Sequence, residues 1–402
     1  MNLTWFNKRK VSYNLNKMKP TNTFSTDLSH YDVIIVGAGL SGSVIARECA
    51  CQEQRVLMID KRDHIAGNCY DKIDPQTNIL ISQYGAHLFH TNSEQVWNYV
   101  QSFASWMRWD HKVVSMVQGN LVPIPVNIQT INHIFNLHLT EDEVDSWFTT
   151  HTKEHQRDLY ENSKQVAISR VGEELYELLF ANYTYKQWEK HGEDLEPEVL
   201  ARIPVRKNYD ERYFTDKYQA LPVGGYTQFV NRILDHPNID IKLQTDWSQI
   251  KDLVQQHQTI VFTGRIDCFF EGHGLPPLEY RSLQFEWKHL PDQLFQPNSV
   301  VNYPGFEFPF TRIVEYKHFY HQYNTTGTVI SVETSCDDGE PYYPVPTAKN
   351  RELYEKYKQL TKQAPNVHFV GRLASYKYFN MDGAILNALT YFEQYLKKQS
   401  SQ

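Results

Sequence analysis

Residues Tyr31–Gly42 read YDVIIVGAGLSG, and this stretch decides the fold. Its first half, Val33–Val36, is a short apolar run of the kind that forms a buried strand. A helical pattern follows through Ala46, and a second apolar run, Val56–Ile59, ends at Asp60. The order of strand, glycine turn, helix, strand and acid predicts a dinucleotide-binding βαβ unit, with a glycine-rich turn in an ordinary α/β unit as the alternative.

The spacing of the three glycines fits the demands of a bound pyrophosphate. Gly37 permits a tight turn after the strand, and Gly39 lets the backbone approach a pyrophosphate at the N-terminus of the helix. Gly42 allows the helix to pack close against the strand. Asp60 ends the second strand, where an acid can accept a hydrogen bond from a ribose hydroxyl. We therefore expect a dinucleotide at the ends of these two strands.

Two later segments have the form of further strands in the same sheet. Ile260–Gly264 and Val367–Gly371 are short β-rich runs that end in glycine. A helical pattern from Met381 to Phe392 follows the second run, and Asp382 or Gly383 is expected to cap this helix. Its N-terminus would face a second part of the cofactor. Contact with one dinucleotide from both ends of the chain is more typical of FAD than of NAD.

The middle of the chain has a helical pattern from about residue 127 to residue 206. Residues Thr140–Glu143 form a capping box, which marks the start of a helix. Val171, Leu175, Leu178 and Leu179 follow at helical spacing and form one apolar face. A helical insert is therefore predicted here.

A strand-rich part follows between about residues 278 and 332. Three β-rich runs lie at 282–287, 311–316 and 328–332, separated by proline and glycine. An antiparallel sheet is therefore predicted. The fold class that results is α/β: an FAD-binding Rossmann-like domain with a helical insert domain and a twisted antiparallel β-sheet domain. The predicted boundaries are 1–30 for a disordered basic extension, 31–105, 220–268 and 347–402 for the discontinuous FAD-binding domain, 127–205 for the helical domain, and 106–126, 206–219 and 269–346 for the sheet domain.

Composition is that of a folded globular protein. The 402 residues are 41% hydrophobic, and 40 basic against 47 acidic side chains give a net charge of -7, which argues against a nucleic-acid partner. The 26 tyrosines and 8 tryptophans suit a sugar or nucleobase ligand, although ordinary packing accounts for most such residues. No apolar run approaches the ~20 residues of a membrane span. The five cysteines include no CxxC pair, as expected of a protein of the reducing cytoplasm without structural zinc.

Six further segments carry a specific resemblance. They are YGAHLFHT at 84–91, YTYKQW at 183–188, RIPVR at 202–206, LPVGGY at 221–226, LEYRSL at 278–283 and EPYYPV at 340–345. Together they resemble UDP-galactopyranose mutases of the bacterial type. The likeness runs in order from about Tyr31 to Lys397, and the extension before Tyr31 has no counterpart in it.

The resemblance implies an activity and its cofactor. The expected reaction interconverts UDP-galactopyranose and UDP-galactofuranose, with N5 of reduced FAD as a covalent nucleophile on the anomeric carbon of the sugar, and supplies galactofuranose for cell-surface glycans. An external reductant must keep the flavin reduced. The resemblance also implies a cytoplasmic homodimer with no membrane attachment.

The resemblance further implies the site residues. Arg202 and Arg312 would hold the diphosphate, because the arginine fork bonds phosphate oxygens and stays charged. The resemblance places His90 near the flavin and the sugar, which makes it the third catalytic candidate, with a satisfied buried histidine as the alternative. A metal pair of His87 and His90 is rejected for want of a third ligand. The substrate-binding candidates are Phe180, Tyr183, Thr184, Trp188, Arg202, Tyr213, Arg312, Tyr343, Tyr378 and Asn380. The cofactor-binding candidates are Gly37, Gly39, Leu40, Ser41, Gly42, Asp60, Lys61, Gly67, Asn68, His87, Gly371, Arg372 and Met381.

One departure from the family pattern leaves substrate choice open. Asn380 stands where the family usually has an acid, and an amide can hydrogen-bond but cannot carry charge. A mutase for a related UDP-sugar, such as an N-acetylated one, is therefore an alternative. A flavin oxidoreductase of the amine-oxidase-like class is the other, because the same scaffold serves both chemistries.

Overall fold

The computed structural model describes residues 27–201 and 205–397. Most of the expected basic extension, and Arg202 with it, lies outside the described residues. Leu28, counted with that extension, is 3% exposed and packs with Ile34, Leu57 and Ile59. The packed part of the described chain therefore includes Leu28.

A parallel sheet organises the part of the chain that was expected to bind the dinucleotide. Its strand order is β10-β2-β1-β11-β17, and every pair is parallel. These strands are β1 (Val33–Val36), β2 (Val56–Ile59), β10 (Ile239–Lys242), β11 (Thr259–Phe262) and β17 (Val367–Phe369). The fully apolar runs form central strands because a parallel sheet is buried on both faces. Two returns of the chain to this sheet, at β11 and β17, confirm the sequence prediction.

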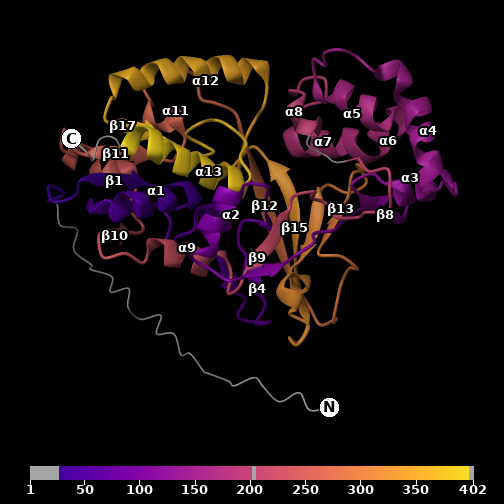
Figure 1. The fold of residues 1–402 in the computed structure, drawn as a ribbon, viewed down its shortest axis with the longest axis horizontal. Coiled ribbons are helices and arrows are strands. Elements are labelled where there is room, and N and C mark those ends of the chain that lie inside the picture. Colours follow the sequence, from indigo (N-terminus) through magenta and orange to yellow (C-terminus); the bar gives the residue numbers. More distant parts are fainter. Residues whose placement is uncertain (1–26, 202–204, 398–402) are drawn as a thin grey trace.

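Helices cover this sheet, and α1 packs against both α9 and α13 (Figure 1). The helices of this part are α1 (Leu40–Cys51), α2 (Glu94–Gln101), α9 (Tyr226–Leu234), α10 (Trp247–Ile250), α11 (Ile266–Phe269), α12 (Ala348–Leu360) and α13 (Met381–Tyr391). Asn380 is the N-cap of α13, so the expected caps Asp382 and Gly383 are wrong. Both residues lie inside the first turn, because the helix begins directly after the extended backbone of Asn380.

Two small sheets connect the nucleotide-binding part to the rest. One pairs β3 (Asp71–Ile73) with β4 (Leu80–Ser82), and the other has the order β5-β9-β6. The strands of the second are β5 (Phe89–Thr91), β6 (Trp106–Arg108) and β9 (Tyr218–Pro222). Since β5 and β9 are far apart in the sequence, this sheet brings the YGAHLFHT segment beside the segment that precedes LPVGGY.

The predicted antiparallel sheet has seven strands and one parallel pair. Its order is β16-β12-β15-β14-β13-β7-β8, and β13 pairs with β7 in parallel. The strands are β7 (Val113–Val117), β8 (Asn120–Ile124), β12 (Tyr280–Leu290), β13 (Val300–Asn302), β14 (Arg312–Glu315), β15 (Thr328–Cys336) and β16 (Tyr343–Pro344). Figure 1 shows this sheet between the nucleotide-binding part and a separate group of helices. The three parts together confirm the predicted fold class.

The helical part consists of short helices. They are α3 (Ile128–Phe135), α4 (Glu141–Thr152), α5 (Ser163–Val171), α6 (Glu173–Tyr176), α7 (Asn182–Trp188) and α8 (Glu198–Ala201). The capping box of Thr140 and Glu143 at the start of α4 is confirmed. The predicted apolar face beginning at Val171 is interrupted, because Gly172 has φ +85° and separates α5 from α6. No helix among the described residues is long and apolar enough to cross a membrane.

The close packing of α1 on β1 yields a stability prediction. A Cβ on Gly42 would stand 2.1 Å from the carbonyl oxygen of Gly37, so Gly42→Ala should destabilise the fold by at least about 1–3 kcal/mol and lower the melting temperature by several degrees. Gly383 occupies the same third position of its helix, but a Cβ there would meet Phe379 at 3.4 Å, an ordinary contact. Gly383→Ala should be neutral or stabilising by up to about 1 kcal/mol. Thermal unfolding of both variants checks this, and equal melting temperatures would contradict the packing argument.

Candidate active site

Glycines from three segments form a cradle at the N-terminus of α1. Gly39 is the N-cap and provides no side-chain cap, and the first turn of α1 carries no acidic residue. A Cβ on Gly67 would stand 2.9 Å from Cα of Gly39, and a Cβ on Gly371 would stand 2.9 Å from Oγ of Ser41. Free N–H groups, the positive end of the helix dipole and room beside the backbone fit a pyrophosphate. The residues present therefore fit the dinucleotide expected here.

Asp60 organises the same cradle from the end of β2. Its carboxylate accepts the backbone N–H of Ala38 in the glycine turn at 2.8 Å and that of Arg62 at 2.9 Å. Arg62 also donates to Oδ1 of Asn68 at 3.0 Å, and its guanidinium lies 4.4 Å from the ring centre of Tyr84. Asp60 thus holds the glycine turn in shape, which is a role in addition to the ribose contact expected from the sequence.

Three cofactor candidates lie at other edges of the cradle. Lys61 is half-exposed and forms an ion pair with Glu340 at 2.6 Å. Leu40 and Met381 are each 8% exposed, in the first turns of α1 and α13. The two helix N-termini therefore carry candidates from opposite ends of the chain, as the sequence predicted.

His87 is a partly buried histidine that lies near two arginines. Its Nδ1 is 2.8 Å from the carbonyl oxygen of Gly85. Burial lowers the pKa of His87 to about 4, against the opposing effect of the bond to Gly85, and the charges of Arg372 and Arg312 lower it further. The imidazole is therefore neutral at physiological pH. A small cavity lies against it, lined also by Tyr226 and Tyr316.

Arg312 and Glu333 form the strongest electrostatic pair of the site. They lie opposite each other on β14 and β15, and Nε of Arg312 is 2.6 Å from Oε2 of Glu333. The glutamate side chain is 1% exposed and the arginine side chain 27%. Burial alone would lower the pKa of Arg312, but Glu333, Tyr183 and Tyr343 raise it well above the ordinary value. A permanently charged guanidinium is therefore held beside the surface of the sheet.

Aromatic side chains from two parts of the fold surround this guanidinium. Tyr183 on α7 and Tyr343 on β16 both interact electrostatically with Arg312, and burial raises the pKa of Tyr183 to about 12. Trp188 meets Tyr343 edge to face at 6.2 Å, and Tyr343 stacks with Tyr378 at 5.9 Å. The phenols are thus protonated hydrogen-bond donors at neutral pH.

Arg372 belongs to the nucleotide-binding part and contacts the aromatic group around Arg312. Its guanidinium donates to the carbonyl oxygens of Phe379 and Tyr342. It also lies 5.1 Å from the ring centre of Tyr378 and 5.8 Å from that of Tyr343. Because it interacts with His87 as well, Arg372 links the cofactor candidates to the substrate candidates.

His90 is held by a different set of contacts. Its Nδ1 is 3.0 Å from Oδ2 of Asp216, and its ring stacks on Phe214 at 3.7 Å. Asn92 donates to the other oxygen of Asp216 at 3.0 Å. Buried His111 interacts electrostatically with both His90 and Arg312. His90 therefore stands beside the group, and it is His87 and His111 that interact electrostatically with Arg312.

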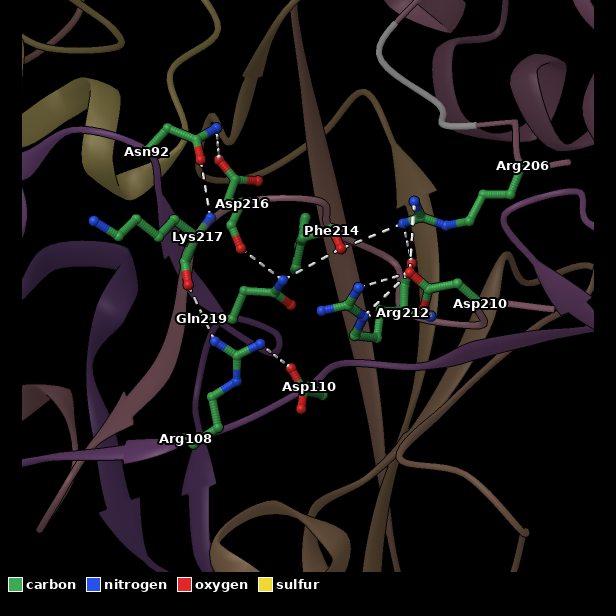
Figure 2. Close-up of polar contacts among 10 residues, drawn as sticks. All are labelled: Asn92, Arg108, Asp110, Arg206, Asp210, Arg212, Phe214, Asp216, Lys217 and Gln219. Atoms are coloured by element: carbon green, nitrogen blue, oxygen red, sulfur yellow. Dashed lines mark hydrogen bonds and ion pairs between the residues drawn. The ribbon is translucent and has the colours of Figure 1, made fainter. Parts of the chain in front are cut away.

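A polar network fixes the segment from Arg206 to Gln219 (Figure 2). Tyr213 belongs to this segment. Arg206 donates to the carbonyl oxygen of Phe214 at 3.3 Å, and the side-chain amide of Gln219 donates to the same oxygen at 3.3 Å. The backbone N–H of Tyr213 donates to the carbonyl of His111 at 2.7 Å. Tyr213 also interacts electrostatically with Tyr183. The irregular backbone thus presents Tyr213 to the aromatic group.

Three substrate candidates stand apart from this group, and Arg202 lies outside the described residues. Phe180 is 7% exposed and lines a small cavity within the helical part. Thr184 is 2% exposed on α7. Asn380 is exposed at the N-cap of α13.

Sequence reasoning missed Glu333, His111, Asp216 and Arg62. Glu333 lies in a strand buried along most of its length, so the residue pattern does not reveal which face it occupies. His111 and Asp216 become neighbours of His90 only through long-range contacts. Arg62 carried a local signal, since it follows Asp60 in the segment that leads to Gly67.

The fold and the site define a class. A glycine cradle for a dinucleotide lies next to an arginine–tyrosine group that can bond an anionic, hydroxyl-rich ligand, as in a flavin-dependent enzyme acting on a nucleotide sugar. A family model described as UDP-galactopyranose mutase matches residues 178–378, and one described as an NAD(P)-binding Rossmann-like domain matches residues 35–103.

Known relatives match this chain over most of its length. A probable UDP-galactopyranose mutase of Klebsiella pneumoniae is 37% identical over 93% of this chain and 97% of its own. A dTDP-fucopyranose mutase of Escherichia coli is 36% identical over 91% and 98%. The UDP-galactopyranose mutase of Mycoplasma pneumoniae is 33% identical over 91% and 96%. The chain belongs to the UDP-galactopyranose mutase family, as its sequence motifs predicted, and is a mutase, an isomerase with a flavin-type cofactor.

Solved structures share the fold. A reduced UDP-galactopyranose mutase superposes with a TM-score of 0.73 at 16% identity, over 92% of this chain and 96% of that one. A putative protoporphyrinogen oxidase from Exiguobacterium sp. 255-15 superposes with a TM-score of 0.63 at 13% identity, over 91% and 99%. At these identities the likeness concerns the fold alone.

The lowered pKa of His87 leads to a prediction about pH. With a pKa of about 4 in the folded protein and about 6.5 in the unfolded chain, His87 should lower stability as the pH falls from about 6.5 towards 4, because only the unfolded chain takes up the proton. NMR of selectively labelled histidine rings, with His87→Gln for assignment, should show no titration of His87 above pH 5. A midpoint near 6.5 would contradict its burial beside the two arginines.

Proposed function

We propose that the protein interconverts UDP-galactopyranose and UDP-galactofuranose, using reduced FAD. Membership of the mutase family supports the reaction, and the glycine cradle with contributions from both ends of the chain supports the dinucleotide. The observation that carries the proposal is the convergence of Arg312, Tyr183 and Tyr343 on one place, since a charged fork among phenol donors suits a diphosphate next to a sugar.

Bound in this cradle, reduced FAD would supply the nucleophile, its N5, that attacks the anomeric carbon of the sugar as UDP departs. The chain itself has four tasks: to bind the dinucleotide, orient the sugar, hold the departing diphosphate and exclude water. The candidates for the first task are Gly37, Gly39, Leu40, Ser41, Gly42, Asp60, Lys61, Gly67, Asn68, His87, Gly371, Arg372 and Met381.

Arg312 is proposed to hold the diphosphate, with Arg202 as its partner. Glu333 fixes Nε of Arg312, which leaves the terminal nitrogens of the guanidinium to donate to phosphate oxygens. Charge that develops on the departing diphosphate would be stabilised by a fixed cation that needs no rearrangement. Oε1 of Glu333 has no hydrogen-bond partner among the described residues and lies beside Gly85, so it remains open as an acceptor.

The tyrosines are proposed to bond the phosphate and sugar oxygens as neutral donors. The pKa of Tyr183 is about 12 and that of Tyr343 is raised, so both phenols keep their protons at the pH of the reaction. Tyr213 and Tyr378 complete this set, and Trp188 packs against Tyr343. Phe180, Thr184, Asn380 and His90 remain proposed contributors on the strength of the family motifs.

The setting of the reaction belongs to the same proposal. The protein would act as a cytoplasmic homodimer, receive electrons from an external reductant, and supply galactofuranose for cell-surface glycans. All five cysteines are free thiols, which is compatible with a reducing compartment.

A second substrate deserves a direct comparison. The dTDP-fucopyranose mutase of Escherichia coli is nearly as similar to this chain as the Klebsiella relative. Asn380, exposed beside Tyr378, stands where the family usually has an acid. A deoxy sugar on a dTDP carrier is therefore the alternative substrate to test.

The first experiment follows product formation by chromatography. Purified flavoprotein, oxidised or reduced with dithionite, is incubated with UDP-galactofuranose or with dTDP-fucofuranose. We expect UDP-galactopyranose to appear only in the reduced sample and faster than the fucose product. Faster conversion of dTDP-fucofuranose would assign the alternative substrate. Conversion in neither case, with flavin bound and no affinity for UDP, would reject the proposal.

A second prediction concerns Arg312. Arg312→Ala should reduce turnover at least about 100-fold, because it removes charge-assisted bonds of about 1.5–3 kcal/mol each and leaves Glu333 buried without its partner. The ratio of flavin to protein should stay unchanged. Arg157→Ala, at an exposed arginine of the helical part, is the control and should keep full turnover. Loss of flavin from the Arg312 variant would instead place this arginine in the cofactor site.

A further inference from the structure

Lys186 on α7 is surrounded by backbone carbonyls of another part of the chain. Its ammonium donates to the carbonyl oxygens of Tyr303, Gly305, Phe308 and Phe310, the last three at 2.9, 3.1 and 2.8 Å. An ammonium has three protons, so four acceptors satisfy it fully. These hydrogen bonds link segments that are far apart in the sequence, because the carbonyls belong to the hairpin between β13 and β14.

That hairpin leads directly into Arg312. Strands β13 and β14 pair with Asn302 opposite Arg312, so residues 303–311 form the connection. Thr311 is bonded through its N–H and its hydroxyl to the carbonyl of Glu333, at 2.9 and 3.0 Å. The rings of Tyr303, Phe308 and Phe310 pack on one another, with centres 4.8–5.6 Å apart. A shift of this loop would therefore be passed to the strand that presents Arg312.

Lys186 itself lies on α7, the helix that also carries aromatic substrate candidates. Tyr183 precedes Lys186 by one turn on α7, and Trp188 follows it. Helix α7 packs against β15 (Figure 1). Its last turn is held separately, since Ser335 and buried Arg281 both donate to the carbonyl of Gln187. Lys186 thus provides the hydrogen bonds that join α7 to the hairpin before Arg312, beside an edge-to-face ring contact of Tyr185 with Phe306 at 5.9 Å.

The ammonium of Lys186 is partly withdrawn from water. Burial lowers its pKa to about 8, and the nearby carboxylate of Glu307 acts in the opposite direction. The charged form prevails at neutral pH, where four carbonyl dipoles stabilise it. Removal of this charge would leave the four oxygens converging without a donor, and each would need a new partner.

We propose that Lys186 is a positioning residue that sets the place of Arg312 relative to the aromatic surface of α7. Within residues 27–201 and 205–397 Lys186 donates hydrogen bonds only to the four carbonyls, and it would act on the diphosphate through the hairpin. The inference rests on the proposed function, in which Arg312 holds the diphosphate and Tyr183 lies beside the sugar. Small displacements of such a group can cost up to about 100-fold in rate.

Lys186→Met should weaken binding of UDP and slow turnover. We expect the dissociation constant for UDP, measured calorimetrically on the oxidised flavoprotein, to rise about 10-fold, and the Michaelis constant to rise with it. Hydrogen exchange should accelerate at residues 303–311. Lys186→Arg, which keeps the charge and several donors, should recover most of the affinity.

Lys317 offers a matched control. It is 1% exposed, and its ammonium donates to Gln293 and to the carbonyls of Thr325 and Gly327 at 2.7–2.9 Å. Lys317→Met breaks a similar cage in a different loop. Its hydrogen exchange should accelerate near residues 325–327, and its affinity for UDP per folded molecule should stay within about twofold of wild type.

Chemical rescue distinguishes loss of the hydrogen bonds from the ammonium to the four carbonyls from a general disturbance of the fold. In Lys186→Ala the four carbonyls should accept methylammonium, which should restore part of the affinity for UDP, whereas tetramethylammonium, which lacks N–H donors, should not. If the wild type binds UDP and turns over but the Lys186 variants keep wild-type affinity and Michaelis constant, the positioning role is wrong. If the wild type neither binds UDP nor turns over, the proposed function fails first.

Discussion

The buried pair of Arg312 and Glu333 constrains the rest of the site. The glutamate is enclosed on β15 and the arginine lies opposite on β14, so each strand must stay in register with the other. A buried charge that loses its partner costs about 3–5 kcal/mol, and a slip of either strand by one residue would turn its member of the pair to the other face of the sheet. The pair therefore fixes the strand register together with the direction in which the guanidinium points.

Each part of the fold contributes one component to the group around this pair. The seven-stranded sheet carries Arg312, α7 carries Tyr183 and Trp188, and the nucleotide-binding part carries Arg372. None of these parts holds a complete site by itself. Contacts between the parts, such as the cation–π contacts of Arg372 with Tyr343 and Tyr378, consequently matter as much as the residues that face a ligand.

Sequence patterns predicted the elements whose conformation depends on residues close together in the chain. The order of strand, glycines and helix at Val33–Ala46 specifies a βαβ unit because each residue acts within its own segment. The interrupted helix at Gly172 and the cap at Asn380 depend on backbone angles that periodicity does not reveal. The pairing of β5 with β9, which sets His90 apart from His87, joins strands too distant for any local pattern to predict. Arg202 stays a prediction from the family motif.

Because enzymes of different chemistry share this fold, the fold alone does not identify the reaction. A putative protoporphyrinogen oxidase superposes over almost its whole length, yet a flavin oxidase has no need to hold a leaving diphosphate. The permanently charged Arg312 beside protonated Tyr183 and Tyr343 suits the anionic leaving group of the proposed reaction. Glu333 holds Nε of that cation, and a diphosphate would supply acceptors for its terminal nitrogens in the proposed reaction. The charged pair on the seven-stranded sheet, rather than the Rossmann sheet, is therefore the feature on which our proposal of a nucleotide-sugar substrate rests.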